Sequence, residues 1–233
     1  MKEVKRLVVL VSGRGSNLQA ILDAVARGSL QLQVVGVFSD QVEPYAFQRA
    51  KEKDVPTVFV DPTAYQGRED YDAALAREVA AFHPDLIALA GFMRVLSPVF
   101  LDNFPGQVVN IHPALLPAFP GLKVQQQAID YGVQYSGCTV HFVDDGMDSG
   151  PIILQSVVPV YQNDTADTLA ERILTKEHLT YPAALQLLAE DRVKLQGRRV
   201  IINWEERIPR QPRDCVLEWL KVKDQIKEVP CSD

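Results

Sequence analysis

Apolar and polar positions recur along this 233-residue chain with two different spacings. Short apolar runs are typical of buried strands, while apolar residues three and four apart indicate helices with one buried face. Strands are predicted at residues 7–11, 34–38, 57–60, 86–90, 108–112, 137–143 and 152–160. Helices are predicted at residues 18–27, 45–53, 69–82, 124–131 and 165–188. Asp164 is the expected N-cap of the last helix.

The order of these elements predicts an α/β fold. Strands alternate with helices up to residue 112, which indicates a doubly wound, mostly parallel sheet with helices on both faces. The consecutive strands further on predict an antiparallel C-terminal part. We expect one domain over residues 1–195 and a C-terminal extension, 196–233, of unknown role. A hairpin is expected near 193–203, then a Pro/Arg-rich linker at 207–214 and a helix at 216–226.

Three polar segments each follow a predicted strand. They are residues 12–17, 91–94 and 110–113. Because the carboxyl ends of parallel strands lie at one edge of a sheet, and ligands bind in the crevice there, we expect the three segments to form one site.

The first segment reads Ser-Gly-Arg-Gly-Ser-Asn and opens a predicted helix. Gly13 and Gly15 allow the backbone to approach an anion, and the helix N-terminus offers N–H groups to it. Ser16 and Asn17 add side-chain donors. The loop lacks the last glycine of a Gly-x-Gly-x-x-Gly fingerprint, so it predicts a monophosphate site, and the alternative is a tight turn.

The third segment, Asn-Ile-His-Pro, carries an amide and an imidazole, and the Gly-flanked loop at 146–150 carries a carboxylate. Asn110 and a protonated His112 could donate hydrogen bonds to a developing oxyanion, while Asp148 favours the charged imidazole. Neither segment contains a Ser or Cys nucleophile. The pattern therefore predicts direct acyl transfer to an amine, formyl transfer in particular. Asp148 alone could be a turn residue.

The other histidines receive structural interpretations. His83 precedes a proline at a helix end, where it would cap the helix. His141 lies within a predicted strand, where a partly buried, hydrogen-bonded ring is expected. His178 and Glu177 fall in the middle of a helix, so a solvated face is predicted for both.

Charge and cysteine content narrow the class of protein. The chain has 24 Lys and Arg against 30 Asp and Glu, a net charge of −6, which argues against a nucleic-acid partner. Its three cysteines lack metal-ligand spacing, so we expect a reducing, cytoplasmic compartment. No signal peptide or membrane span is recognised, so no membrane partner is expected.

Residues 90–94, 110–120 and 137–153, with the N-terminal loop, resemble the folate-dependent formyltransferases over about residues 6–195. Residues 12–17 are similar to those of the glycinamide ribonucleotide branch. The resemblance implies a formyltransferase-like Rossmann variant that moves the formyl group of 10-formyltetrahydrofolate to glycinamide ribonucleotide in purine biosynthesis. It implies no metal, a phosphate site in the N-terminal half and a folate site in the C-terminal half.

The resemblance also implies roles for single residues. Catalysis would fall to Asn110, His112 and Asp148. The ribonucleotide would be bound by Gly15, Ser16 and Asn17, and its amine end by Glu177. The folate site would be lined by Arg68, Met93, Arg94, Val95, Leu96 and Asn110.

The chain departs from the family pattern at a few positions. Ala114 stands where Ser is usual, Phe119 where Tyr is common, and Lys-Val-Gln at 123–125 where His is frequent. The resemblance therefore implies no particular substrate contacts for this segment.

Three alternatives remain. A methionyl-tRNA formyltransferase would normally add a basic C-terminal domain, and a formyltetrahydrofolate deformylase an extra N-terminal domain. A catalytically silent nucleotide- or folate-binding module is the third. Whether the chain is a monomer or a homodimer is not determined.

Overall fold

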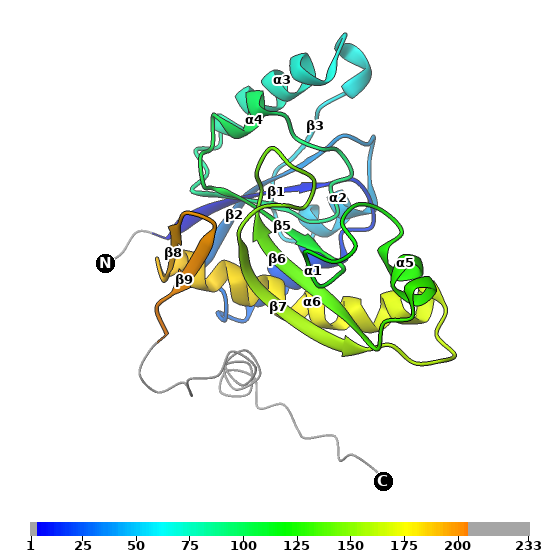
Figure 1. Ribbon diagram of the computed structural model, residues 1–233. Helices are drawn as coiled ribbons and strands as arrows, with labels where there is room; N and C mark the ends of the chain where they lie inside the picture. The colour runs from blue at the N-terminus through cyan, green and yellow to red at the C-terminus, as the bar shows by residue number, and fades with distance from the viewer. Residues whose placement is uncertain (1–3, 205–233) are drawn as a thin grey trace.

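A computed structural model describes residues 4–204 of the chain. Within this range, seven strands form one sheet in the order β3-β2-β1-β4-β5-β6-β7 (Figure 1). Their bounds are β1 (Lys5–Val11), β2 (Leu32–Ser39), β3 (Thr57–Phe59), β4 (Leu86–Leu89), β5 (Val108–His112), β6 (Tyr135–Phe142) and β7 (Ile152–Pro159).

Strands β1 to β5 pair in parallel, whereas β6 is antiparallel to both β5 and β7. The predicted α/β fold, mostly parallel with an antiparallel C-terminal part, is therefore confirmed. Since β1 pairs with both β2 and β4, the strand order reverses at β1.

Helices cover both faces of the sheet (Figure 1). They are α1 (Ser16–Ala26), α2 (Tyr45–Lys51), α3 (Arg68–Ala80), α4 (Pro98–Leu101), α5 (Val124–Tyr131) and α6 (Ala166–Ala189), with a 3-10 turn, η1 (Pro62–Ala64). The sequence did not predict α4 or η1. Each is a single turn that begins with proline, too short for a helical spacing of apolar residues.

Two apolar cores follow from the alternation of side chains along the strands. Leu7 and Val9 of β1 pack in the core that also holds residues of α1, α2, α5 and α6. Val8 and Leu10 point to the opposite face and pack with residues of α3 and α4. Strand β1 is thus buried on both faces, which explains its unbroken apolar run.

Helix α6 crosses one face of the sheet and is fixed to the strands by a buried phenol. The hydroxyl of Tyr181 lies 3.0 Å from the carbonyl oxygen of Leu89 and 3.1 Å from that of Val109. It therefore links α6 to β4 and β5 one residue before Asn110.

The predicted N-cap of α6 is wrong. Thr165, not Asp164, caps the helix, in a reciprocal capping box with Thr168. Asp164 instead accepts two hydrogen bonds from the guanidinium of Arg172, both 2.7 Å long. That ion pair holds the carboxylate beside the helix start without making it the cap.

A second, two-stranded sheet follows α6. Strands β8 (Val193–Gln196) and β9 (Arg199–Ile202) form the predicted hairpin, drawn in orange in Figure 1. The predicted linker and terminal helix at 207–226 lie outside the described residues. Among residues 4–204, no helix is both long and apolar enough to cross a membrane.

Candidate active site

The loops after β1 and β4 meet where the strand order reverses. The N–H of Ser12 donates to the carbonyl of Gly91 over 3.1 Å, and the Ser12 hydroxyl accepts from the N–H of Met93 over 2.9 Å. The segments 12–17 and 91–94 are therefore joined at one edge of the sheet, as predicted. Strand β5 ends at the same edge, beside β4.

The structure brings together the three predicted catalytic side chains. Asp148 Oδ2 lies 3.3 Å from His112 Nδ1, and Asp148 Oδ1 lies 3.5 Å from the Asn110 amide nitrogen. The side chains of His112 and Asp148 are only 5% and 15% exposed. A carboxylate so withdrawn from water interacts strongly with the imidazole and the amide.

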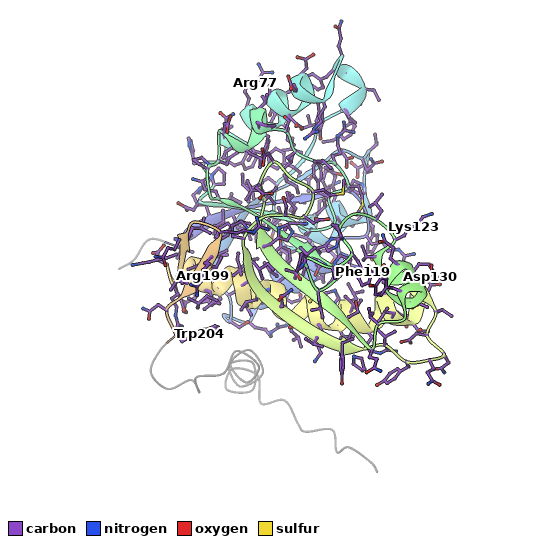
Figure 2. All side chains as sticks on the ribbon, in the orientation of Figure 1. Arg77, Phe119, Lys123, Asp130, Arg199 and Trp204 are labelled. Atoms are coloured by element: carbon purple, nitrogen blue, oxygen red, sulfur yellow. The ribbon has the colours of Figure 1, made fainter. Side chains whose placement is uncertain are left out.

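Both ring nitrogens of His112 face oxygen acceptors. Nε2 lies 2.8 Å from the carbonyl of Phe119, and Nδ1 faces Asp148. A neutral imidazole has one N–H, whereas this arrangement accommodates two donors. The protonated ring therefore fits the site, with its Nε2 hydrogen donated to Phe119, which lies on the loop between β5 and α5 (Figure 2).

His141 also belongs to this cluster, although the sequence analysis did not assign it to the site. Strands β5 and β6 pair so that Asn110 lies opposite His141. Its Nε2 is 3.3 Å from the Asn110 amide nitrogen and 3.8 Å from Asp148 Oδ1. The ring is buried and hydrogen-bonded, as predicted, and its Nδ1 donates to the carbonyl of Phe142 over 2.7 Å.

Burial lowers the pKa of His141 below its usual 6.5, although its bond to Phe142 and the nearby Asp148 oppose the change. The ring is therefore neutral near pH 7, with Nε2 free to accept from the Asn110 amide. Strand register was the signal that could have found His141, because an antiparallel partner of β5 must place a side chain beside Asn110.

Asp148 has a left-handed backbone conformation, with φ of 50°. Its Oδ2 also accepts from the N–H of Gly121 over 2.8 Å. A non-glycine residue in this conformation is held by its surroundings. Asp148 thus links the loop before α5 to His112.

A cavity of about 330 Å³ opens in front of these side chains. Five of the six predicted folate-site residues line it, namely Met93, Arg94, Val95, Leu96 and Asn110. Lys123, from the segment that departs from the family, also lines it. The Arg94 guanidinium stacks 4.7 Å from the centre of the Tyr71 ring.

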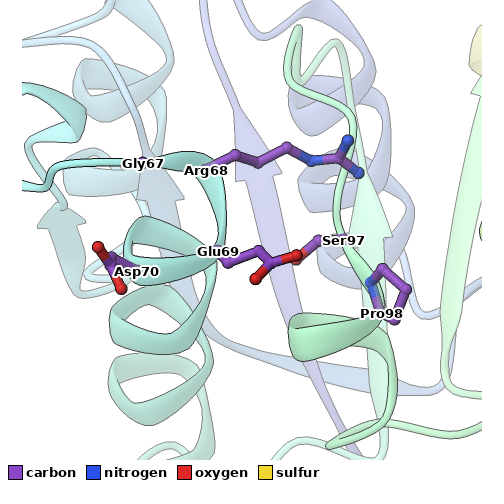
Figure 3. A pocket seen from close by; sticks show the side chains of 6 residues that line it. All are labelled: Gly67, Arg68, Glu69, Asp70, Ser97 and Pro98. Carbon is purple, nitrogen blue, oxygen red and sulfur yellow. The ribbon is translucent and has the colours of Figure 1, made fainter.

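The sixth, Arg68, lines a different and shallower pocket of about 420 Å³ at the start of α3. Figure 3 shows Arg68 and Glu69 reaching toward the segment of Ser97, with Asp70 pointing away. Arg68 lies 3.8 Å from the buried carboxylate of Asp72. The structure therefore places Arg68 beside the folate-site segment, not inside the cavity that Asn110 and His112 line.

The glycine loop enters α1 through Gly15, which is left-handed with φ of 69° and has no side-chain cap. The first turn of α1 carries no acidic residue, so its N–H groups remain available to an anion. Beside the loop, the Arg49 guanidinium donates to the carbonyl of Arg14 over 2.9 Å.

Asn17 and Glu177 form a buried pair between α1 and α6. The Asn17 amide donates to Glu177 Oε2 over 2.7 Å, across 160 residues of sequence. Burial raises the pKa of Glu177 above its usual range, and the Asn17 hydrogen bond opposes that change. The prediction of a solvated Glu177 is wrong, because α6 turns this face toward α1. His178 is half-buried, and burial lowers its pKa.

Asn17 keeps one polar atom without a protein partner. Its side-chain oxygen is buried and makes no hydrogen bond within the part of the chain that the structure describes. No group of three or more His, Cys, Asp or Glu suited to a metal ion occurs among residues 4–204.

Sequence comparison places this geometry in a family. The formyl transferase family matches residues 5–185, a range that includes the glycine loop, Asn110, His112, Asp148 and Glu177. The chain belongs to the formyl transferase family. The membership in this family that the motifs indicated is thereby confirmed.

Members of this family resemble the chain over most of its length. Phosphoribosylglycinamide formyltransferase of Escherichia coli K12 is 40% identical over 205 residues, covering 88% of this chain and 96% of that protein. Glycinamide ribonucleotide transformylase 1 from Symbiobacterium toebii aligns with a TM-score of 0.84 at 49% identity, covering 85% of this chain and 94% of that one.

A more distant structure comes from another branch. The formyltetrahydrofolate deformylase of Pseudomonas syringae aligns with a TM-score of 0.79 at 29% identity, covering 86% of this chain and 66% of that one. The fold is therefore shared by a transformylase and a deformylase.

Proposed function

We propose that this formyl transferase moves the formyl group of 10-formyltetrahydrofolate to the amine of glycinamide ribonucleotide, a step of purine biosynthesis. Two observations support the proposal. The glycine loop and the catalytic cluster lie at one edge of the sheet, and the relatives with 40% and 49% identity carry this activity in their names. The substrates are the ribonucleotide and the formyl folate.

The ribonucleotide phosphate binds at the glycine loop. Gly15, Ser16 and Asn17 present the free N–H groups of the α1 N-terminus, where the helix dipole favours negative charge. Arg49 positions the loop by its bond to Arg14 and adds positive charge nearby. A monophosphate fits this short loop better than a dinucleotide does.

The amine end of the ribonucleotide is bound by Glu177. A buried carboxylate with a raised pKa gains most from a partner that donates hydrogen bonds, and the substrate amine is one. The buried oxygen of Asn17, without a protein partner, is a second acceptor at this end.

The folate binds in the cavity lined by Met93, Val95 and Leu96, with Arg94 toward its acidic tail. This places the formyl group near Asn110 and His112. Arg68 lines the neighbouring pocket and adds a second positive charge on this side of the folate site.

The reaction passes through a tetrahedral intermediate. The amine nitrogen attacks the formyl carbon, and the carbonyl electron pair moves to oxygen. Asn110 donates an amide hydrogen to this oxyanion, and His112 donates the hydrogen on Nε2. For that donation the formyl oxygen must replace the Phe119 carbonyl, which now accepts from Nε2.

His141 is a positioning residue in this scheme. Its neutral ring accepts at Nε2, so the Asn110 side chain is held with its nitrogen toward His141 and Asp148. One amide hydrogen goes to His141, and the other turns from Asp148 Oδ1, 3.5 Å away, to the oxyanion.

Collapse of the intermediate breaks the bond between the formyl carbon and the folate nitrogen. That nitrogen takes up a proton as it leaves, and the attacking amine loses one. His112, or a water bound to Asp148, gives its proton to the folate nitrogen, and the same group takes up the proton that the amine loses. The Asp148 carboxylate favours the charged imidazole before and after this exchange.

One assay tests the proposal against its alternatives. Purified protein is given 10-formyltetrahydrofolate with glycinamide ribonucleotide, initiator tRNA or water as acceptor. We expect tetrahydrofolate to form at a rate that depends on the ribonucleotide, with formylated ribonucleotide in equal amount. Free formate without an acceptor would identify a deformylase, and no turnover would identify a silent binding module.

A further inference from the structure

The loop that carries Asp148 is a tight structure of its own. Asp144 Oδ1 accepts from the N–H of Gly146 over 3.2 Å and from the hydroxyl of Ser149 over 2.6 Å. A Cβ added at Gly150 would lie 1.8 Å from the carbonyl oxygen of Phe142. The chain on either side of Asp148 is therefore closely constrained.

A hydrogen bond from a distant part of the chain reaches this loop. The guanidinium of Arg198 donates to the main-chain carbonyl of Ser149 over 2.6 Å. Ser149 directly follows Asp148, so this bond holds the peptide between Ser149 and Gly150, one residue beyond the left-handed Asp148 backbone. The loop also carries three carboxylates, at 144, 145 and 148, next to which a cation is favourable.

The hairpin presents Arg198 from a fixed base. Gly197, with φ of 59°, and Arg198 form the two-residue turn between β8 and β9. Val200 and Ile202 of β9 pack against the apolar core beside α6. The base of the hairpin is closed by Arg192 and Asn203, whose N–H donates to the Arg192 carbonyl over 2.8 Å.

We propose that Arg198 is a positioning residue for catalysis, which clamps the Ser149 carbonyl and so holds Asp148 against His112. The proposal rests on the formyl transfer proposed above for its kinetic consequence. It gives the hairpin a role in the active site, although Arg198 touches neither substrate nor the reacting atoms.

The test compares Arg198→Ala with Arg199→Ala, a neighbouring exposed arginine on β9 that serves as the matched control (Figure 2). We expect Arg198→Ala to lower kcat about 3- to 10-fold, as loss of one exposed charge-assisted hydrogen bond permits. KM for the ribonucleotide should stay unchanged. Arg198→Lys should restore part of kcat, because an ammonium can donate to the same carbonyl.

A second measurement does not depend on turnover. Amide hydrogen exchange over residues 144–150 should be faster in Arg198→Ala than in wild type and in Arg199→Ala, while exchange in β1 and α6 stays the same. Unchanged loop exchange in Arg198→Ala overturns the clamp whether or not the protein transfers formyl groups. Faster exchange with kcat equal to that of Arg199→Ala overturns its role in catalysis. A wild type that shows no formyl transfer refutes the proposed function alone.

Discussion

At the scale of single residues, the proposed oxyanion donors, Asn110 and His112, give the most direct test of the mechanism. Asn110→Ala and His112→Ala should each lower kcat about 100- to 1000-fold, the usual cost of losing one such donor, with KM little changed. Steady-state kinetics with both substrates measures this, and circular dichroism checks the fold. Near-normal turnover in either folded variant would contradict its catalytic role.

Glu177 couples stability to substrate binding. Burial raises the pKa of Glu177 above its usual 4.5, so the folded state disfavours the ionised carboxylate. The protonated carboxyl therefore contributes its full stability to the fold below pH 4.5, and this contribution is lost as the pH rises through the folded-state pKa. Glutamine is uncharged at every pH and can still accept from Asn17.

Glu177→Gln should therefore raise the Tm relative to wild type, by an amount that grows as pH rises above about 4.5. The same variant should bind the ribonucleotide more weakly, because it lacks the charge that binds the amine. Calorimetric melting between pH 4 and 8 and titration with ribonucleotide measure the two effects. A Tm difference independent of pH would mean that folding does not shift the pKa of Glu177.

At the scale of elements, the glycine loop depends on the packing of α1 against α2. A Cβ at Gly15 would lie 2.6 Å from the Ala46 Cβ, and φ there is 69°. Gly15→Val should therefore displace the loop and weaken ribonucleotide binding at least about 10-fold, with folate binding retained.

Two other glycines serve for comparison, Gly28 beyond the far end of α1 and Gly13 within the loop. Gly28 has φ of 73° with open space around it, so Gly28→Ala reports the backbone strain alone. Gly13 has open space and no positive φ, so Gly13→Ala should leave the Tm unchanged and tests only whether a methyl group in the loop obstructs the anion. Ribonucleotide affinity of Gly15→Val equal to that of Gly28→Ala would mean that the loop is only a turn.

At the scale of the whole molecule, the hairpin β8–β9 crosses the predicted domain boundary at residue 195. Its apolar residues pack on the main core, and Arg198 reaches the Asp148 loop. A chain ending after residue 204 should keep formyl transfer within about twofold of the full chain. A chain ending after 195 should melt lower and turn over more slowly.

Thermal melting and the formyl-transfer assay compare the three lengths. Equal stability and activity at all three would place the functional boundary at 195, as the sequence predicted. Loss of activity already at 204 would give residues 205–233 a part in function.

Most of the fold was predictable because it is encoded locally. The unbroken apolar run of β1 follows from burial on both faces, and α5 was predicted at the bounds observed. A strand that ends in Asn-Ile-His-Pro indicates a functional site, because its polar residues directly follow the apolar ones. Single turns such as α4 were not predicted, because one turn is too short to show a helical periodicity.

The sequence by itself determined the alternation of elements, the glycine loop and the chemistry at the end of β5. Only the tertiary structure decided that Glu177 is buried against Asn17, that His141 faces Asn110, and that Arg198 reaches the Asp148 loop. Periodicity records each residue's neighbours along the chain. These three contacts instead depend on strand order, register and helix orientation, which set the distance between residues remote in sequence.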